Sequence, residues 1–435
     1  MPNVEQSKPS ILAPKKLSEA AAILCLMLFL AAYITNSMDR LIFPMLLTWI
    51  GKSYGYSLKQ AGLLSVIFTL GIGVAAIPAG YLLDRWNRKA VLLTGMVIYS
   101  IFTLATIFAA GFYDMLFYRA MTGVGEALQI AALFAAASSY FYKHKAMVIG
   151  TINLGFGIGG AMGPYFGTKM TLATNNWHTP FVVYTLLGLI MAGVIWIFVP
   201  KIFTESRGPV DLNPADQPAV LHIPENFWNR NVKLCTLVAV LLGLIQYGFI
   251  GLYTTFLIKH LHFAPLTAGL ALSLYGIGCM FGLPCGWISD RLTTRYVAIA
   301  AYCGLAINAF LIFDVATSPQ FIFVLSATEG LFASSFLHPC GLSLVQRSVR
   351  PEMIGRATGF FTSMMFLGGA GSGLLFAWLA DRISWNAAGL IQISLFSAIT
   401  VITLLCMNEK ELFLAGSAST IGGVGKVDRV KEVTA

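Results

Sequence analysis

The segment PAGYLLDRWNRK at residues 78–89 has a partial copy, PCGWISDR, at residues 284–291. Four residues, Pro78, Gly80, Asp84 and Arg85, recur in the copy as Pro284, Gly286, Asp290 and Arg291. Each is shifted by 206 positions, and agreement of four such different residue types at one offset is improbable by chance. The chain therefore consists of two homologous halves, and parallel repeats of this kind are typical of secondary transporters.

The composition places both halves in a membrane. Of the 435 residues, 57% are hydrophobic and only 11% are charged, and the mean hydropathy is +0.76. Soluble domains carry about a quarter charged residues, so this chain is depleted of charge. A string of soluble domains is excluded as well, because no stretch has the polar face that a soluble helix needs.

Twelve apolar runs are each long enough to cross a bilayer, which takes about 20 residues in a helix. The first six cover roughly 18–47, 58–83, 89–110, 113–141, 146–172 and 178–199, and the second six cover roughly 232–258, 266–289, 296–314, 319–346, 353–379 and 386–407. We therefore expect an all-α membrane protein of two pseudo-symmetric six-helix bundles. The expected parts are a tail (1–17), a bundle (18–199), a proline-rich linker (200–231), a second bundle (232–407) and a tail (408–435).

The positions of Lys and Arg predict the orientation. With the N-terminus inside, only five of the 28 fall in outer loops, namely Lys52, Lys59, Lys169, Lys259 and Arg382. Two more, Arg40 and Arg119, lie within helices, and the rest are cytoplasmic. Both termini are thus expected in the cytoplasm, and the expected location is the inner membrane of a bacterium.

Several functional classes find no support in the sequence. The net charge of +9 is spread over short gaps between apolar runs, which argues against nucleic acid as a partner. The seven cysteines show no metal-ligand spacing, and there is no ATP-binding GxxxxGK[ST] loop. Gly155-x-Gly157-x-x-Gly160 matches a dinucleotide pattern but lies inside an apolar run, so we interpret it as a helix-packing surface. We expect no metal, no cofactor and no enzymatic activity.

The repeated loop, together with twelve spans and a central linker, resembles the major facilitator superfamily. In that family the loop holds the two halves together on the cytoplasmic side when the transporter is open to the outside. The resemblance implies a conformational latch made of Gly80, Asp84, Arg85, Arg88, Asp290 and Arg291. The alternative, a basic loop that only sets topology, accounts for Arg88 but not for the repetition of Gly80 and Asp84.

Four charged residues lie inside the predicted spans of the first half: Asp39, Arg40, Arg119 and Glu126. A charge at the bilayer centre costs about 2.5–3.5 kcal/mol on insertion scales, so such residues usually face a cavity and are functional. Arg119 and Glu126 are seven residues apart, nearly two helical turns, and share one face. Two acids and two guanidiniums can pair, so a purely structural ion-pair network is the competing interpretation.

The segments around these four residues indicate which families within the superfamily the chain resembles. Asn36-Ser-Met-Asp39-Arg40 and Arg119-Ala-Met-Thr-Gly-Val-Gly-Glu126 are similar to motifs of the anion:cation symporter family, and also to the spinster family of proton-driven lipid and solute transporters. The resemblance to the symporters implies that Asp39 and Glu126 couple protons and that Arg40 and Arg119 bind a carboxylate.

The second half offers mainly neutral polar and aromatic groups for substrate selection. The candidates are Gln246, Tyr247, Tyr253, Tyr275, Ser334, Ser335 and His338. Each tyrosine can equally be an ordinary packed aromatic, and His338 can be a hydrogen-bond partner between helices. Glu329 and His338 are nine residues apart, half a turn out of phase in an α-helix, so both are not expected to face one cavity.

The resulting hypothesis is a proton-coupled symporter of a small organic anion, such as a sugar acid or another carboxylate, working by alternating access. The partners are the anion, protons and membrane lipid, and we expect a monomer to be the working unit. The alternative is a proton-coupled transporter or exporter of amphipathic lysolipid-like or drug-like molecules.

Overall fold

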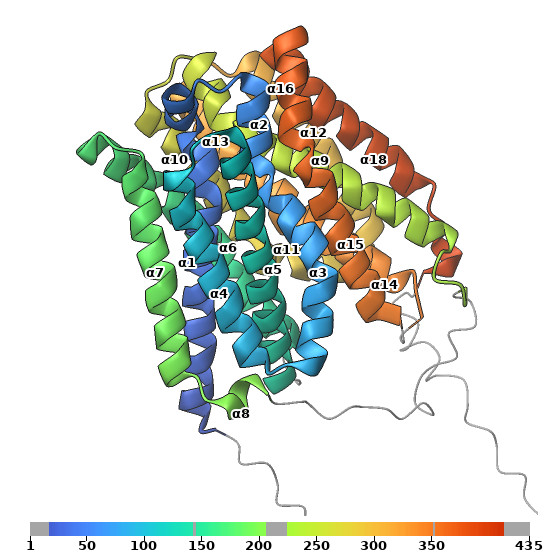
Figure 1. Cartoon of the computed structure of the whole chain (residues 1–435). Helices are drawn as coiled ribbons and strands as arrows, with labels where there is room; N and C mark the ends of the chain where they lie inside the picture. The colour runs from blue at the N-terminus through green and yellow to red at the C-terminus, as the bar shows by residue number, and fades with distance from the viewer. Residues whose placement is uncertain (1–16, 142–144, 206–223, 351–352, 413–435) are drawn as a thin grey trace, which may run out of the picture.

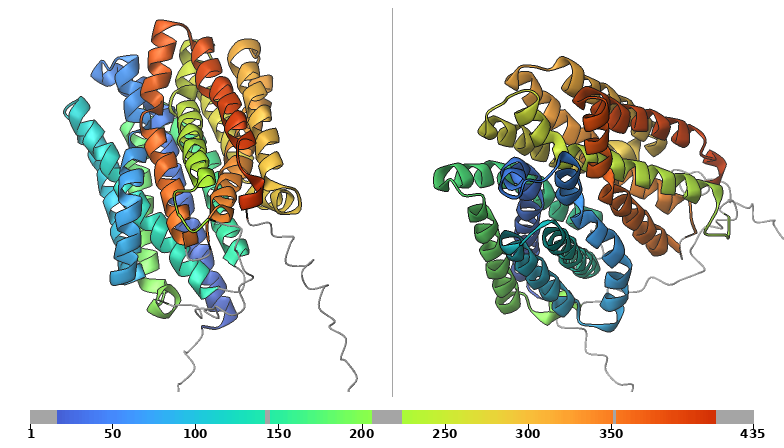
Figure 2. Two further views of the ribbon diagram at one scale, coloured as in Figure 1. Left: turned by 90° about the vertical axis from the view of Figure 1, so that its right-hand side faces the viewer. Right: turned by 45° about the horizontal axis from the view of Figure 1, so that its top comes forward.

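The computed structural model describes residues 17–141, 145–205, 224–350 and 353–412. Two helical bundles stand side by side, one from each half of the chain (Figures 1 and 2). The first bundle comprises α1 (Glu19–Tyr54), α2 (Leu58–Val66), α3 (Phe68–Arg85), α4 (Arg88–Ala105), α5 (Phe112–Tyr140), α6 (Lys145–Thr174) and α7 (His178–Phe198). A short α8 (Lys201–Thr204) follows it, and residues 206–223 of the predicted linker lie outside the described residues, as do 1–16 and 413–435 of the tails.

The second bundle contains more interruptions. It comprises α9 (Arg230–Lys259), α10 (Pro265–Cys279), α11 (Gly282–Arg291), α12 (Thr294–Phe310), α13 (Pro319–Gly330), α14 (His338–Arg347), α15 (Ile354–Ala370), α16 (Ser372–Arg382), α17 (Trp385–Gly389) and α18 (Phe396–Leu405). Three π-helical segments occur in it: η4 (Leu311–Val315) ends the span of α12, whereas η5 (Leu331–Leu337) joins α13 to α14 and η7 (Leu390–Leu395) joins α17 to α18. Among the described residues no π-helix occurs in the first bundle.

The expected twelve spans are present. Eleven helical stretches are long and apolar enough to cross a membrane, and α10 with α11, bent by 43° at their junction, makes the twelfth. Large apolar side chains such as Trp196, Ile197 and Ile402 are exposed at the surface of the bundles, as expected for side chains in contact with lipid. The predicted all-α fold of two six-helix bundles is thereby confirmed.

Glycine contacts reveal the internal symmetry in three dimensions. A Cβ added to Gly71 would overlap the carbonyl oxygen of Ala120, and one added to Gly123 would overlap that of Phe68. In the second bundle, Gly278 meets Ala327 and Gly330 meets Tyr275 in the same way, each residue 207 positions further along the chain. Both bundles therefore use the same close helix approach, which only glycine permits.

The glycine pattern of α6 serves packing, as expected. A side chain at Gly159 or Gly163 would overlap the backbone of α1 near Ile34 and Met38. The alternate glycines Gly157 and Gly160 face α10 of the other bundle instead. The GxGxxG match is thus a two-sided helix contact within α6.

The two bundles meet most closely at the end of the molecule where α2 and α16 lie, at the top of Figure 1 and here called the far side. Gly62 of α2 and Gly373 of α16 touch through their backbones, and the Thr254 hydroxyl donates a 2.9 Å hydrogen bond to the Pro44 carbonyl. Lys59 and Asp381 form an exposed ion pair at 3.2 Å across the same seam. These contacts close the far side.

The opposite end, here called the terminus side because α1 begins there, is open between α3 and α15. A cavity of about 420 Å³ lies between them, lined on one side by Gly80 and on the other by Gly355 and Gly359. A Cβ added to any of these three glycines would meet nothing within 4 Å. The structure is therefore closed on the far side and parted on the terminus side.

We predict that Gly123→Ala destabilises the protein, because the added methyl group collides with the carbonyl oxygen of Phe68. Overpacking of this kind costs about 1–3 kcal/mol. Thermal unfolding of the purified protein, followed by size-exclusion fluorescence, should show a lower midpoint. Gly193→Ala in α7 is the control, since nothing lies within 4 Å of that position, and an equal drop for both variants would contradict the packing role.

Candidate functional site

The four charges predicted within the membrane lie together, deep in the first bundle. Asp39 and Arg40 come from the middle of α1, and Arg119 and Glu126 come from α5. None of the four side chains is more than 3% exposed. Arg119 and Glu126 are predicted to share one face of α5, and in the structure both lie toward α1.

Arg40 and Glu126 form the one ion pair found within this set. Nε and Nη2 of Arg40 lie 2.9 and 2.7 Å from Oε2 of Glu126. Asn36, one turn before Arg40, accepts a 3.2 Å hydrogen bond from Nη2, and its amide donates to Gln129 of α5 at 2.8 Å. Gln129 in turn donates to the Ala32 carbonyl at 3.1 Å. This network holds the pair in place and neutralises both charges.

Asp39 has a different environment. Its Oδ2 accepts a 2.7 Å hydrogen bond from the Thr103 hydroxyl of α4, whereas its Oδ1 is buried without a partner among the described residues. The expected second acid–guanidinium pair is therefore not formed. A neutral hydroxyl partner compensates a buried carboxylate poorly, so the site suits the protonated acid.

Arg119 is the unusual member of the set. Its side chain is fully buried, yet Nε, Nη1 and Nη2 find no hydrogen-bond partner in the described part of the chain. The guanidinium lies over the rings of Phe43 and Phe68, at 4.6 and 5.5 Å from their centroids. Asp39 and Glu126 act on Arg119 electrostatically without bonding to it. The structure therefore contains a buried cation whose five N–H groups are all available.

The second bundle contributes a neutral wall next to these charges. Tyr247 packs edge-on against Phe68 at 5.8 Å and also contacts Phe366 of α15 at 5.7 Å. The Gln246 amide donates a 3.2 Å hydrogen bond to the Tyr275 hydroxyl, while its Oε1 is buried and unpartnered. Phe68 thus separates the guanidiniums of one bundle from the polar wall of the other.

Two of the remaining predicted residues of the second half, Tyr253 and Ser335, have hydrogen-bond partners within their own bundle. The hydroxyl of Tyr253 hydrogen-bonds that of Ser326, and Ser335 donates to the Gly278 carbonyl at 3.0 Å. Ser334 and His338 are half-buried. The half-turn separation expected for Glu329 and His338 assumed an α-helix, but η5 lies between them and its wider turns change the angle per residue. That the two residues do not share one cavity stays a prediction.

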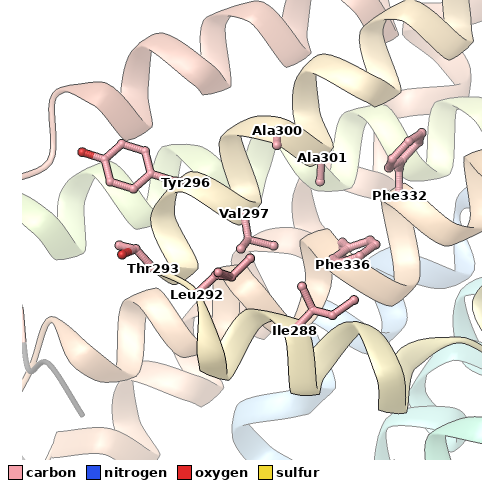
Figure 3. Close-up of a pocket in the computed structure, with 9 residues that line it drawn as sticks. All are labelled: Ile288, Leu292, Thr293, Tyr296, Val297, Ala300, Ala301, Phe332 and Phe336. Atoms are coloured by element: carbon pink, nitrogen blue, oxygen red, sulfur yellow. The ribbon is translucent and has the colours of Figure 1, made fainter. Parts of the chain in front are cut away.

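Two cavities, one within the second bundle and one between the bundles, are lined by residues other than the four charges. The cavity in Figure 3, of about 520 Å³, lies within the second bundle between α11, α12 and η5, and its lining is apolar except for Thr293 and Tyr296. The cavity of about 420 Å³ between α3 and α15 has an aromatic lining of Phe227, Trp228 and Phe360, with Arg356 beside them. The charged set is thus sealed in this state, with the second cavity on the terminus side of it.

The repeated loop between α3 and α4 is anchored by the start of the linker. The carboxylate of Glu205 accepts hydrogen bonds of 3.1 Å from the backbone N–H groups of Arg88 and Lys89, which caps the N-terminus of α4. The guanidinium of Arg85 lies over Tyr81, and that of Arg291 lies over Trp287, each within its own helix. The side chains of Asp84 and Asp290 lie outside the described residues.

Sequence reasoning missed several members of the site. Phe43 and Phe68, which enclose Arg119, are two of 31 phenylalanines, and Thr103 and Gln129 carry no motif. Of the residues that were missed, Asn36 alone belongs to a motif quoted above, and it was given no function there. Across the described residues, no group of three or more His, Cys, Asp or Glu side chains could hold a metal ion.

Comparison with known proteins gives a consistent family. The model of the Major Facilitator Superfamily matches residues 25–283 and 235–422. A hexuronate transporter of Bacillus subtilis is 34% identical over 173 residues, which is 39% of this chain and 40% of that protein. The sphingosine-1-phosphate transporter SPNS2 of Mus musculus is 30% identical over 181 residues, 41% of this chain and 32% of that protein.

The fold agrees as well. A crystal structure of a bacterial homologue of the human lysosomal transporter Spinster, in an inward-facing and unoccupied conformation, superposes with a TM-score of 0.67 at 18% identity, covering 89% of this chain and 96% of the other. The family and these relatives are membrane transporters and not enzymes. From the matched sequence and the two-bundle fold, this chain is a multi-pass membrane transporter of the Major Facilitator Superfamily.

Proposed function

We propose that this protein is a proton-coupled symporter of a small organic anion, such as a sugar acid or another carboxylate, and that it works by alternating access. The observation that carries the proposal is the buried guanidinium of Arg119, which has no hydrogen-bond partner among the described residues. A buried charge without a partner is costly, so the site is complete only when an anion joins it. The hexuronate transporter among the relatives supports this substrate class.

The two arginines would then have different tasks. Arg40 is neutralised by Glu126 and braced by Asn36, so it shapes the site in this state. Arg119 keeps its planar fork of donors free, and this fork suits a bidentate grip on a carboxylate. Glu126 becomes a competitor of the substrate only if its bond to Arg40 breaks.

Asp39 would carry the coupled proton. As a carboxylate it would compete with the substrate for Arg119, which its charge already influences. Protonation removes this competition and leaves Arg119 to the substrate. The Thr103 hydroxyl can donate to either form of the acid, which allows the proton to come and go without loss of the local structure.

We further propose that the terminus side is cytoplasmic, because most Lys and Arg residues lie at that end, so that this state is inward-facing. The latch of Gly80, Asp84, Arg85, Arg88, Asp290 and Arg291 would close in the outward-facing state, when α3 approaches α15. The local stacking of Arg85 on Tyr81 and of Arg291 on Trp287 supports an open latch here.

A second candidate is proton-driven transport of an amphipathic, lysolipid-like molecule. The cavity between α3 and α15 favours it, because Phe227, Trp228 and Phe360 suit an acyl chain and Arg356 suits an anionic head group. The likeness to a sphingosine-1-phosphate transporter points the same way. Counterflow of labelled sugar acids and of labelled lysolipids in proteoliposomes, with and without a pH gradient, separates the two candidates. Exchange of lysolipids alone would overturn the carboxylate proposal.

Substitution of Arg119 by Lys should weaken carboxylate binding although the charge is kept, because an ammonium group cannot make the planar two-bond contact. Charge-assisted hydrogen bonds are worth about 1.5–3 kcal/mol, so affinity should fall roughly ten- to hundredfold. Calorimetric binding to the detergent-solubilised protein measures this. Near-native affinity would mean that Arg119 is only a counter-ion.

The two acids should respond differently to neutralisation. Asp39→Asn mimics the protonated acid, so exchange without a gradient should persist while gradient-driven accumulation is lost. Glu126→Gln should instead strengthen binding of an anionic substrate, because it releases Arg40 from its only ion pair in the described set and leaves a second guanidinium for the anion. Accumulation against a pH gradient and counterflow are measured for both variants. Unchanged accumulation by Asp39→Asn would remove that residue from the coupling role.

The wall of the second bundle should select the substrate and leave coupling intact. Gln246→Leu removes the unpartnered Oε1 and the bond to Tyr275, so competition among carboxylates that differ in hydroxyl groups should change order. Ser335→Ala is the control, since Ser335 already bonds the Gly278 carbonyl. Loss of proton coupling in Gln246→Leu with an unchanged ranking would contradict this division of tasks.

A further inference from the structure

Glu329 is a buried acid that the proposed mechanism does not use. It lies near the end of α13, inside the second bundle, with 1% of its surface exposed. Its Oε2 accepts a 2.6 Å hydrogen bond from the Asn308 amide of α12. None of the described residues provides it with a cation, so an ionised carboxylate would be uncompensated.

The amide partner is held in one orientation. Nδ2 of Asn308 also donates to the Leu325 carbonyl at 3.0 Å, and Oδ1 accepts a 2.7 Å bond from the Thr328 hydroxyl. In this arrangement Asn308 presents a donor to Glu329 and directs its acceptor oxygen to Thr328. A fixed neutral donor binds a neutral carboxyl group at its carbonyl oxygen and leaves the acid proton on the other oxygen.

Helix packing does not require an acid at this position. The glycine contacts that relate the bundles by 207 residues place Thr122 of α5 at the point equivalent to Glu329. The Thr122 hydroxyl simply bonds the Tyr118 carbonyl one turn back. In the first bundle the helix contact through Gly123 forms without a neighbouring carboxyl group. The contact through Gly330 in the second bundle therefore does not depend on Glu329.

The helix geometry changes directly after this acid. η5 begins at Leu331, two residues beyond Glu329, whereas α5 stays α-helical throughout at the equivalent place. Single π-helical turns within α-helices occur frequently at functional sites, since their wide turn leaves backbone groups free to rearrange. The acid therefore lies at the point where α13 can change shape.

We propose that Glu329 is a second proton-binding site, in the second bundle and separate from the Asp39 site, and that it holds its proton in the state described here. The inference that Glu329 binds a proton is drawn from the local structure alone. The link between this proton and transport rests on the proposed function. The proton keeps the carboxyl group neutral between α12 and α13. Its loss would put an uncompensated charge next to η5 and disfavour the present packing.

The ionisable neighbours of Glu329 carry no charge that could compensate it. Those nearest to it on the elements around α13 are Tyr253 on α9 and Tyr275 on α10. Cys279 on α10, Tyr302 on α12, Asp314 in η4 and His338 at the start of α14 lie on neighbouring elements and exert no electrostatic effect on Glu329. Tyr253 and Tyr275 are within electrostatic reach, and both are neutral near pH 7. Asp314 is exposed and accepts a bond from Asn386, away from the bundle interior.

Infrared difference spectroscopy of the full chain in lipid, without substrate, tests the proton directly. A band component of a protonated carboxyl group should be present at pH 7, decline as the pH is raised, and be lost in Glu329→Gln, which separates it from any protonated carboxyl signal of Asp39. It should persist in Asp39→Asn and Glu126→Gln. A carboxylate signal for Glu329 at pH 7, or a protonated band unchanged up to the highest pH that the protein tolerates, would overturn the proposal.

Exchange kinetics test the link to transport. Counterflow without a pH gradient should decline on the alkaline side in the wild type, because Glu329 loses its proton there. Glu329→Gln mimics the neutral acid and should keep at least three times the wild-type rate at that pH. Glu329→Asp, which keeps a titratable group, should still decline. Identical alkaline profiles of Glu329→Gln and the wild type would refute the link, whereas failure of the Asp39 proposal would leave this difference in place.

Discussion

Compensation of buried charge is the constraint on which this structure depends. In the interior of a membrane protein every charge must find an opposite charge or be neutralised, since no water is available to solvate it. Arg40 meets this requirement through Glu126, and the bonds from Asn36 to Gln129 fix the pair. Arg119 does not, because the aromatic rings of Phe43 and Phe68 give it contact without a counter-charge of its own. The incomplete compensation at this one residue is the basis of the proposal that the site takes an anion.

The two bundles share one packing design. Gly71 and Gly123 in the first bundle, and Gly278 and Gly330 in the second, allow the same backbone contacts. The seam between the bundles is made differently. It is formed by α2 against α16, by α6 against α10 and by α3 against α15, and a cavity parts α3 from α15 on the terminus side. Under the proposed alternating access, the far-side contacts, such as Gly62 against Gly373, must separate when the site opens to that side.

The bundles differ in how they hold polar groups. The first concentrates ionisable residues on α1 and α5, whose helices run without π-helical turns. The second has neutral groups facing the seam and, among the side chains that the structure describes, one buried acid, Glu329, where α13 gives way to η5. A duplicated ancestral unit has thus become asymmetric in charge and in backbone geometry, while the glycine contacts that shape each bundle have been kept.

Much of this could be read from the sequence, because membrane insertion leaves few alternatives. Long apolar runs must be helices, the copy of residues 78–85 at 284–291 requires two related halves, and charges within a span must be functional or paired. What the tertiary structure decided is which partner each charge has. The sequence is compatible with two acid–guanidinium pairs. In the structure Asp39 accepts a hydrogen bond from Thr103 of α4, and Arg119 has no hydrogen-bonded acid among the described residues. This arrangement follows from the way in which α1, α4 and α5 pack together. The turn of η5, which shifts His338 relative to Glu329, was equally invisible, because a π-helical segment arises from packing and leaves no mark in hydropathy.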